Sequence, residues 1–274
     1  MTYMTDLFGV AGKTALVTGG ATGIGRMIAE GLVQGGARVL IASRKADACE
    51  AVAAELNALG APGAAEGFGG DVSSPEGLAA LASEVKERTD TLHILVNNAG
   101  ISWGEPIETF PVEQWHRVMN VNVAAMFTLT REVLPLLRAA ASDDDPARIL
   151  NIGSVMGTVP LAEGAYSYTM SKAAVHHMTR VFASEFASDR ITCNAFAPGP
   201  FKSKMTAFAT GREETAAKVA AGIPIGRIGR ADDMAGAALF LCSRAGSYVS
   251  GAILPLDGGM AAKAPGNLFA NALT

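Results

Sequence analysis

“TALVTGGATGIGRMIAEGLVQ”, residues 14–34, is the stretch that decides the fold. It begins with apolar and β-branched residues, which predict a buried strand that leads into a glycine-rich turn. Apolar residues then recur at helical spacing. Glycines in such a turn let the backbone approach a phosphate group, and the start of the helix stabilises its negative charge. Because the turn itself contains no GK[ST] sequence for a triphosphate, it predicts a dinucleotide-binding site.

The same alternation of strand and helix continues along the chain. Strands are expected at residues 14–20, 37–44, 64–72, 92–100, 147–154, 190–199 and 251–259, and helices at 24–36, 46–60, 74–88, 112–140, 167–188 and 231–243. Near-continuous apolar strands that alternate with helices predict a parallel sheet with both faces covered, and right-handed crossovers make it doubly wound. We therefore expect an α/β protein with a single doubly wound Rossmann domain, a seven-stranded parallel sheet flanked by helices on both faces.

One domain is expected to span residues 1–274, because no repeat or interior linker is visible. Its core runs from about residue 10 to 260, and a substrate loop covers about 200–225. The tail at 261–274 has no assigned role beyond a potential subunit contact. The acidic run “SDDDP” at 142–146 is expected to be a solvated loop between a helix and a strand.

The composition excludes several classes of protein. Of the 274 residues, 49% are hydrophobic and 18% are charged, which excludes a disordered chain. A net charge of −4 with no basic cluster argues against a nucleic-acid-binding surface. The first residues lack a secretory signal, and no apolar run approaches the roughly 18 residues that span a bilayer. Three widely separated cysteines suit a reducing compartment, so we expect a cytoplasmic protein without membrane contact.

The sequence “EGAYSYTMSKAAVHH” at 163–177 contains two candidate catalytic tyrosines. Tyr168 and Lys172 are four residues apart and share one face of a helix, whereas Tyr166 does not share that face. An ammonium group beside a phenol favours the phenolate and lowers the phenol pKa from its usual value of about 10, as a general acid near neutral pH requires. A solvated helix face is the alternative, because this spacing is common by chance.

The end of the second expected strand indicates which dinucleotide binds. It carries Ser43, Arg44 and Lys45. An acidic residue at this position would hydrogen-bond the adenosine ribose and repel a 2′-phosphate. A hydroxyl beside a guanidinium instead suits a phosphate dianion, so the pattern predicts a preference for NADP(H). An ordinary pair of surface cations is the alternative.

Further motifs follow in order: “TGGATGIG” (18–25), “DV” (71–72), “NNAG” (97–100), “NVN” (120–122), “IGS” (152–154), “YTMSK” (168–172) and “PGPFKSKM” (198–205). In this order they resemble the short-chain dehydrogenase/reductase family over about residues 10–260. The likeness is greatest to NADPH-dependent 3-oxoacyl-carrier-protein reductases, and “NNAGISWG” and “PARILNIGSVMG” are similar to the type associated with rhamnolipid synthesis. Bacterial carbonyl reductases and alcohol dehydrogenases share the same framework.

The resemblance implies four catalytic residues. Tyr168 would donate a proton to the substrate carbonyl oxygen, which Ser154 would hold. Lys172 would lower the Tyr168 pKa and hold the nicotinamide ribose. Asn122 would support a chain of water molecules to that lysine, whereas the neighbouring Asn120 lies outside the matching position. No metal is implied.

The resemblance also implies which residues bind NADP(H). They are Gly19, Ala21, Thr22, Gly23, Ile24, Gly25, Ser43, Arg44, Asp71, Val72, Asn98, Ala99, Gly100, Tyr168, Lys172, Pro198, Gly199, Phe201 and Ser203. Thr22 departs from the family pattern, because many NADP-specific relatives have a basic side chain there. Arg44 would therefore carry most of the discrimination against NAD(H).

We therefore expect reversible, NADPH-dependent reduction of a ketone or 3-oxoacyl carbonyl to a secondary alcohol. Five basic residues are candidates for contact with an acyl carrier protein: Lys202, Lys204, Arg212, Arg227 and Arg230. The apolar stretch 205–211 fits equally well as a cover over bulky hydrophobic ketones or steroid-like alcohols. A non-catalytic dinucleotide-binding redox sensor is the alternative class, disfavoured because both the tyrosine and the lysine are present.

Three expectations concern packing. By resemblance, the helices at 112–140 and 167–188 pair across a two-fold axis in a homotetramer or dimer. Trp103 is expected either at the edge of the substrate cleft or in ordinary packing. His176 and His177 are expected in a subunit contact or at the surface, because the proposed chemistry does not need them.

Overall fold

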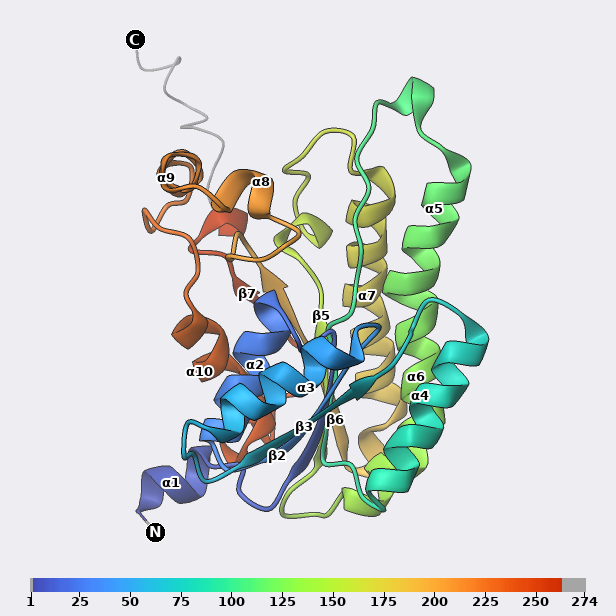
Figure 1. Cartoon of the computed structure of the whole chain (residues 1–274), viewed down its shortest axis with the longest axis vertical. Coiled ribbons are helices and arrows are strands. Elements are labelled where there is room, and N and C mark those ends of the chain that lie inside the picture. The colour runs from blue at the N-terminus through green and yellow to red at the C-terminus, as the bar shows by residue number, and fades with distance from the viewer. Residues whose placement is uncertain (1, 263–274) are drawn as a thin grey trace.

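The strands form one parallel sheet, as the sequence predicts. The computed structural model describes residues 2–262, and the seven strands within them are ordered β3-β2-β1-β4-β5-β6-β7 (Figure 1). They are β1 (Thr14–Thr18), β2 (Arg38–Ser43), β3 (Ala64–Gly69), β4 (Ile94–Asn97), β5 (Ala147–Ile152), β6 (Ile191–Pro198) and β7 (Ile253–Leu256). The order reverses between β1 and β4, which confirms the doubly wound α/β fold and places a ligand crevice at the carboxyl ends of these strands.

Helices cover both faces of the sheet (Figure 1). Adjacent residues of β1 point to opposite faces, so Val17 enters one core and Leu16 the other. Three helices pack on the side of Val17: α2 (Gly23–Gln34), α3 (Ala46–Asn57) and α10 (Ala231–Cys242). Three others pack on the side of Leu16: α4 (Pro75–Arg88), α6 (Ala125–Ala140) and α7 (Tyr166–Glu185). The five central strands, β2, β1, β4, β5 and β6, are therefore buried on both faces, which explains their largely apolar sequences, whereas the edge strands β3 and β7 are partly exposed.

A glycine allows close contact between α2 and α10. A Cβ atom on Gly31 would lie 2.7 Å from the Cβ atom of Ala235. No side chain larger than hydrogen fits there without moving one of the helices. This contact sets the position of α10 against the helix whose first turn follows the glycine-rich segment.

The segment expected as one helix at 112–140 contains a π-helical turn. Helix α5 (Val112–Met119) passes into η2 (Asn120–Ala124), where the amide of the first α6 residue bonds to a carbonyl five residues earlier. Two hydrogen bonds join the Asn122 side chain to the backbone of Ile101. Asn122 Oδ1 accepts from the Ile101 amide, and Asn122 Nδ2 donates to the Ile101 carbonyl, each at 2.9 Å. The regular helix is thus interrupted where a side chain anchors it to the loop after β4.

Within the described residues, α-helices lie outside the expected elements at two places. The short helix α1 (Tyr3–Phe8) precedes β1. The expected substrate loop contains α8 (Ala207–Thr210) and α9 (Glu213–Ala221). The strands end earlier than expected because the polar and glycine-rich residues after them form turns. The expected tail lies outside the described residues from 263 onward.

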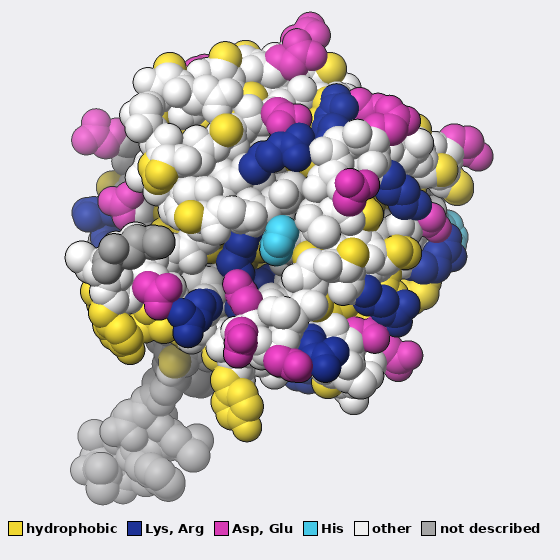
Figure 2. Space-filling model, turned by 90° about the horizontal axis from the view of Figure 1, so that it is seen from below, with side chains coloured by type: hydrophobic (Ala, Val, Ile, Leu, Met, Phe, Trp, Pro, Cys, Tyr) yellow, Lys and Arg dark blue, Asp and Glu magenta, His cyan; other side chains and the backbone are white. Residues whose placement is uncertain are grey.

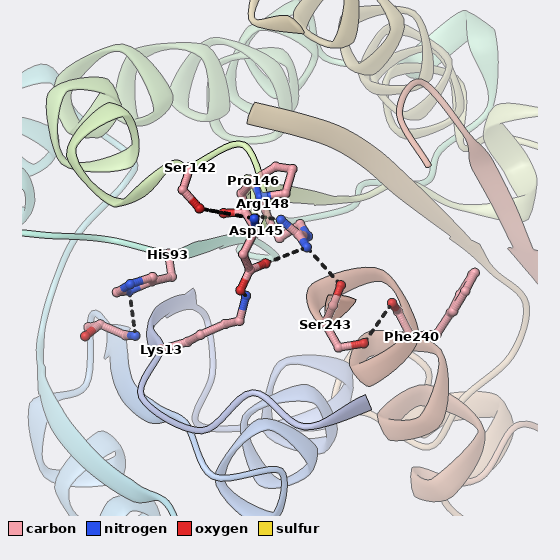
Figure 3. A network of polar contacts seen from close by, with 9 residues as sticks. Lys13, His93, Ser142, Asp145, Pro146, Arg148, Phe240 and Ser243 are labelled. Carbon is pink, nitrogen blue, oxygen red and sulfur yellow. Dashed lines mark hydrogen bonds and ion pairs between the residues drawn. The ribbon is translucent and has the colours of Figure 1, made fainter. Parts of the chain in front are cut away.

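A cluster of charged groups closes the amino ends of β1 and β5 (Figure 3). Lys13 and Arg148 both contact the Asp145 carboxylate, the arginine at 2.9 Å, and Arg148 also donates to the Ser243 carbonyl at 2.9 Å. Their side chains are only 8% and 2% exposed. The expectation of a solvated acidic run is therefore wrong for Asp145, whose carboxylate neutralises two buried cations; it holds for Asp143, whose side chain is 81% exposed.

The surface on this side carries charges of both signs. Figure 2, seen from below, shows Lys and Arg side chains interspersed with Asp and Glu side chains, with a histidine among them. Such a mixture lacks the concentrated positive field that attracts a phosphate backbone. Within residues 2–262, no helix is long and apolar enough to cross a membrane.

Candidate active site

A large cleft opens at the carboxyl ends of the strands. Its volume is about 810 Å³, and it runs from the turn after β1, past the start of α7, to the segment after β6. Ligands of doubly wound sheets bind at this edge. Most residues assigned from the sequence line it: Gly19, Thr22, Gly23, Ile24, Ser43, Arg44, Asp71, Val72, Asn98, Ala99, Gly100, Ser154, Tyr168, Lys172, Pro198, Gly199, Phe201 and Ser203.

Three assigned residues lie behind the wall of the cleft instead. Ala21 is 8% exposed and belongs to the core beneath the turn. A Cβ atom on Gly25 would lie 2.4 Å from Asn98 Nδ2, so this glycine permits close packing. Asn122 is fully buried in the π-helical turn. Ala21 and Gly25 therefore help to shape the turn, and their contact with a cofactor stays a prediction.

The glycine-rich turn forms a slot lined by backbone. Gly19 and Gly23 have φ angles of 66° and 55°, a conformation that residues with a side chain rarely adopt. A Cβ atom on Gly23 would also lie 2.9 Å from the Cβ atom of Ser203 on the opposite wall. The Asn98 side chain holds the turn, donating to the carbonyls of Thr18 at 2.8 Å and Gly19 at 3.2 Å. A slot kept free of side chains at the start of a helix fits a pyrophosphate.

One end of the cleft lies beyond β2, where the sequence predicts the adenosine of the cofactor. The Ser43 hydroxyl is 3.0 Å from the sulfur of the buried Cys49, and the Arg44 side chain is exposed beside it. Asp71 accepts a hydrogen bond from the Ser73 backbone amide at 2.9 Å. Hydrogen bonding to Ser73 and, more weakly, the charge of Arg44 lower the pKa of the Asp71 carboxyl. This end therefore presents a hydroxyl, a guanidinium and an ionised carboxylate.

The structure separates the two tyrosines as helical spacing predicts. Lys172 Nζ lies 5.6 Å from the centre of the Tyr168 ring and donates to the Ile152 carbonyl at 2.6 Å. Tyr166 turns away and packs edge-on against Phe110, with ring centres 5.7 Å apart. Tyr168 and Lys172 line the cleft, and Tyr166 does not.

Ser154 reaches the cleft from the end of β5. It caps the short helix η3 (Val155–Gly157), where its hydroxyl oxygen accepts from the Met156 amide at 3.2 Å. The residue is 6% exposed, so its hydroxyl lies in a sheltered part of the cleft. It lies close enough to the Tyr168 phenol to act on the pKa of that phenol. A hydroxyl, a phenol and an ammonium group therefore meet around one small volume.

The pKa values of this group differ from the expectation in one respect. The sequence predicts that Lys172 lowers the Tyr168 pKa, but burial raises the pKa of that phenol, and hydrogen bonding to Ser154 opposes the rise only in part. The Lys172 ammonium donates a hydrogen bond to the Ile152 carbonyl. Burial also lowers the pKa of Lys172 to about 8. At pH 7 the phenol is protonated and the lysine carries its charge.

Asn122 and Lys172 approach each other around Gly100. A Cβ atom on Gly100 would lie 3.2 Å from Asn122 Oδ1 and 3.6 Å from Lys172 Nζ. Asn122 also donates to the Ser171 hydroxyl at 2.9 Å, which joins the π-helical turn to α7. Asn120, the other asparagine of the motif, is exposed. The structure thus places the asparagine assigned from the family beside the lysine.

The two histidines of α7 differ in environment. His177 is exposed, as expected. His176 is only 4% exposed within this chain alone, so the expectation of a surface or subunit-contact position is wrong for it. Its ring packs against Gly153 and Gly157 at the end of β5, which a count of helical positions does not reveal.

Beyond the catalytic group, the cleft has an apolar opening. It is lined there by Trp103, Leu161, Met205 and Phe208, and the last three are 46%, 41% and 87% exposed. The Trp103 indole donates to the Glu105 carboxylate at 3.2 Å, which settles its position at the edge of the cleft. Leu161 was not predicted from the sequence to line the cleft. Its position as an apolar residue in a polar, glycine-rich loop was the one available indication of such a role.

The segment after β6 forms the opposite wall. Phe201 is 2% exposed, and a Cβ atom on Gly229 would lie 2.3 Å from its ring, so Phe201 anchors this wall as well as lining it. The Ser203 hydroxyl lies 2.9 Å from that of Thr206. Met260 also lines the cleft and was not identified from the sequence, because it reaches the site only through the fold.

Comparison with known proteins shows which families and proteins the chain is similar to. Residues 19–261 match the protein family described as “Enoyl-(Acyl carrier protein) reductase”. The chain is 44% identical, over 93% of its length and 99% of the relative, to the rhamnolipids biosynthesis 3-oxoacyl-[acyl-carrier-protein] reductase of Pseudomonas aeruginosa. It is 39% identical, over 94% of its length and 98% of the relative, to the 2-dehydro-3-deoxy-D-gluconate 5-dehydrogenase of Bacillus subtilis.

Solved structures show the same likeness. The Pseudomonas aeruginosa RhlG/NADP active-site complex has a TM-score of 0.89 at 44% identity, covering 93% of this chain and 99% of that one. A gluconate 5-dehydrogenase from Burkholderia cenocepacia in complex with NADP and tartrate has a TM-score of 0.86 at 30% identity, covering 96% of this chain and 100% of that one.

The doubly wound sheet, the glycine turn and the serine, tyrosine and lysine at its carboxyl edge define an oxidoreductase of the dinucleotide-binding class. The chain belongs to the short-chain dehydrogenase/reductase family.

Proposed function

We propose that this protein reversibly reduces the carbonyl group of a ketone or a 3-oxoacyl thioester to a secondary alcohol with NADPH. One observation carries the proposal: Ser154, Tyr168 and Lys172 meet in the same cleft as a backbone slot that fits a pyrophosphate. A proton donor, an oxygen-binding hydroxyl and a cation are the groups that carbonyl reduction requires.

Several features of the cleft support NADPH as the cofactor. Ser43 and Arg44 line the adenosine end, where an acidic residue would repel a 2′-phosphate. The Arg44 side chain is exposed at this end, so its guanidinium is free to approach an anion. Relatives whose structures are described as NADP complexes have the same fold. We assign the pyrophosphate to the slot at Gly19 and Gly23.

Each catalytic side chain has a distinct role in this proposal. Bound NADPH supplies a hydride to the carbonyl carbon. Tyr168 donates its phenol proton to the carbonyl oxygen, and its raised pKa keeps that proton in place at neutral pH. Ser154 orients the same oxygen from its position at the end of β5. Lys172 stabilises the negative charge that develops when the phenol gives up its proton, and Asn122 holds the lysine side of the cleft.

The opening of the cleft favours a substrate with an apolar substituent. Leu161, Met205 and Phe208 present exposed apolar surface there, which an aliphatic chain or ring would cover. A relative named as a 3-oxoacyl-[acyl-carrier-protein] reductase supports the thioester. Of the basic residues considered for contact with a carrier protein, Arg227 already pairs with Asp233 at 2.6 and 2.9 Å. Bulky hydrophobic ketones or steroid-like alcohols are the alternative substrates.

The test is a substrate panel with purified protein. NADPH oxidation is followed with 3-oxoacyl thioesters, with and without an acyl carrier protein, with free hydrophobic ketones, and with 5-keto sugar acids. Mass spectrometry of the product identifies the secondary alcohol. We expect many turnovers with the 3-oxoacyl thioesters or with the free hydrophobic ketones. Turnover confined to the 5-keto sugar acids would contradict the proposed substrate class. NADPH binding without turnover would favour a redox sensor.

We also propose a homo-oligomer, a tetramer or dimer, in which α5, α6 and α7 contact their counterparts. Phe127 on α6 and Val181 on α7 are each 49% exposed, and Met170 is 52% exposed. Apolar side chains on neighbouring helices are typical of a surface that another subunit covers. Sedimentation velocity at micromolar concentration tests this, and a monomer would contradict it.

A further inference from the structure

Three groups of α7 face the end of β5. Tyr168, Lys172 and His176 follow one another at four-residue spacing, so they form one stripe along the helix. Tyr168 lines the cleft together with Ser154, which acts on the Tyr168 pKa, and Lys172 donates to the Ile152 carbonyl at 2.6 Å. The proposed chemistry uses the first two groups and leaves the third, His176, without a role.

The His176 ring is wedged between the two glycines that flank the Ser154 turn. A Cβ atom on Gly153 would lie 2.3 Å from His176 Nε2, and a Cβ atom on Gly157 would lie 2.8 Å from His176 Cε1. Real Cβ atoms do not make contacts this short, so the ring leaves no room for a side chain at either position. Backbone atoms add to the restriction, since the same Cβ atoms would lie 2.8 Å from the Phe196 carbonyl oxygen and 2.7 Å from the Lys172 carbonyl carbon, respectively.

This position spans both ends of the turn that carries Ser154. The Gly153 amide bonds to the Phe196 carbonyl at 2.8 Å on one side, and the Gly157 amide bonds to the Ser154 carbonyl at 2.9 Å on the other. Ser154 and η3 are therefore held between β6 and the histidine of α7. Tyr168 and His176 both lie on α7, whereas Ser154 lies on the turn against which the ring packs. A change in the size or position of the ring would therefore change the distance between the turn and α7, and with it the distance between Ser154 and Tyr168.

Burial of the His176 ring costs free energy, and a need to fill space does not by itself explain why a histidine occupies this position. His176 is 4% exposed, and its Nε2 atom has no hydrogen-bond partner. An aliphatic side chain would avoid an unpaired buried nitrogen. Burial and the charges of Lys172 and Arg180 lower the pKa of His176 to about 4, so the ring is neutral beside the catalytic lysine. The other groups in contact with it, on the Ser154 turn, are backbone atoms that do not titrate.

We propose that His176 is a positioning residue for the reaction: its ring sets the distance between the Ser154 turn and α7, and so aligns the serine hydroxyl with Tyr168. This inference rests on the proposed carbonyl reduction. It assigns no contact between His176 and the substrate. In this proposal His176 affects kcat only through Ser154. An experiment can therefore distinguish this role from a general contribution of His176 to folding.

The test is a double-mutant cycle on ketone reduction. His176→Ala removes the wedge, His176→Gln keeps a planar polar group, and His177→Ala is the matched control on the exposed neighbour. We expect kcat to fall about 10- to 100-fold in His176→Ala, as for a misplaced catalytic group, with the Kd for NADPH changed less than about 2-fold. His176→Gln should recover part of the loss, and His177→Ala should retain wild-type kcat.

The decisive comparison is made in the Ser154→Ala background. If His176 acts through Ser154, adding His176→Ala to Ser154→Ala lowers kcat by less than about 3-fold further. Losses that multiply, or a folded His176→Ala protein with wild-type kcat, would overturn the inference. Should His176→Ala fail to give a cooperative melt, the same cycle is run with His176→Gln and read by the same rule. Absence of turnover in the wild type would instead count against the proposed function.

Discussion

Replacing Lys172 with methionine should remove a pH-dependent destabilisation from the folded protein. The lysine is 3% exposed, and burial lowers its pKa from 10.5 to about 8. Methionine is similar in length and carries no charge to desolvate. The replacement also leaves the Ile152 carbonyl without its partner at 2.6 Å, so the absolute stability at one pH mixes two effects of opposite sign. The pH dependence isolates the charge.

The sign follows from where the proton binds. Below pH 8 the lysine is protonated in both the folded and the unfolded protein, and the full penalty of burying its charge is present. Between pH 8 and 10.5 only the unfolded chain holds the proton, so the stability of the wild type rises with pH. At about 1.4 kcal/mol per pH unit, the rise over this interval is about 3 kcal/mol.

The assay is urea unfolding of both proteins at several pH values from 7.5 to 10. Groups common to both proteins titrate alike, so the difference between the two unfolding free energies reports the lysine. Across this range we expect the unfolding free energy of the wild type to rise by about 2 to 3 kcal/mol more than that of the methionine variant. A difference that stays constant with pH would refute the reasoning, since it would mean that folding does not perturb the lysine.

Three further outcomes are expected. Asp145→Asn leaves two buried cations without their carboxylate and should lower the free energy of unfolding, measured in urea, by about 3 kcal/mol. The control Asp143→Asn removes a charge from an exposed pair and should lower it much less. Equal effects would contradict the importance of the buried cluster. Ser43→Asp with Arg44→Ala should lower the ratio of NADPH to NADH kcat/KM at least about 10-fold, and an unchanged ratio would contradict the cofactor assignment. Carbonyl reduction at saturating NADPH should slow as the pH rises through about 8, where Lys172 loses its charge; a rate that is flat up to pH 10 would contradict the role of the ammonium.

Much of the fold follows from local patterns. The apolar strands, the glycine turn and the helices each have a signature that spans a few neighbouring residues, and topology rules then restrict the sheet order. The pairing of Tyr168 with Lys172, and the exclusion of Tyr166, follow from helical spacing alone. Spacing cannot supply the environment, however. Burial, not the ammonium, dominates the Tyr168 pKa, and burial arises from segments distant in sequence.

The expectations that failed share a cause. Asp145 belongs to a run of acidic residues, and only the fold brings Lys13 and Arg148 to it. His176 looks like its exposed neighbour in sequence, yet the Ser154 turn covers it. The π-helical turn depends on a bond between Asn122 and Ile101, which are 21 residues apart. Each of these features is set by contacts between elements, which periodicity does not report.

The central claim is that the Tyr168 phenol delivers the proton, and one matched pair of variants tests it. Tyr168→Phe and Tyr166→Phe each remove a single oxygen from the first turn of α7. At saturating NADPH and ketone, the first should lose about 10²- to 10⁴-fold in kcat while still binding NADPH with wild-type Kd, and the second should remain close to wild type. A Tyr168→Phe enzyme that keeps turning over, or a Tyr166→Phe enzyme that stops, would contradict the account.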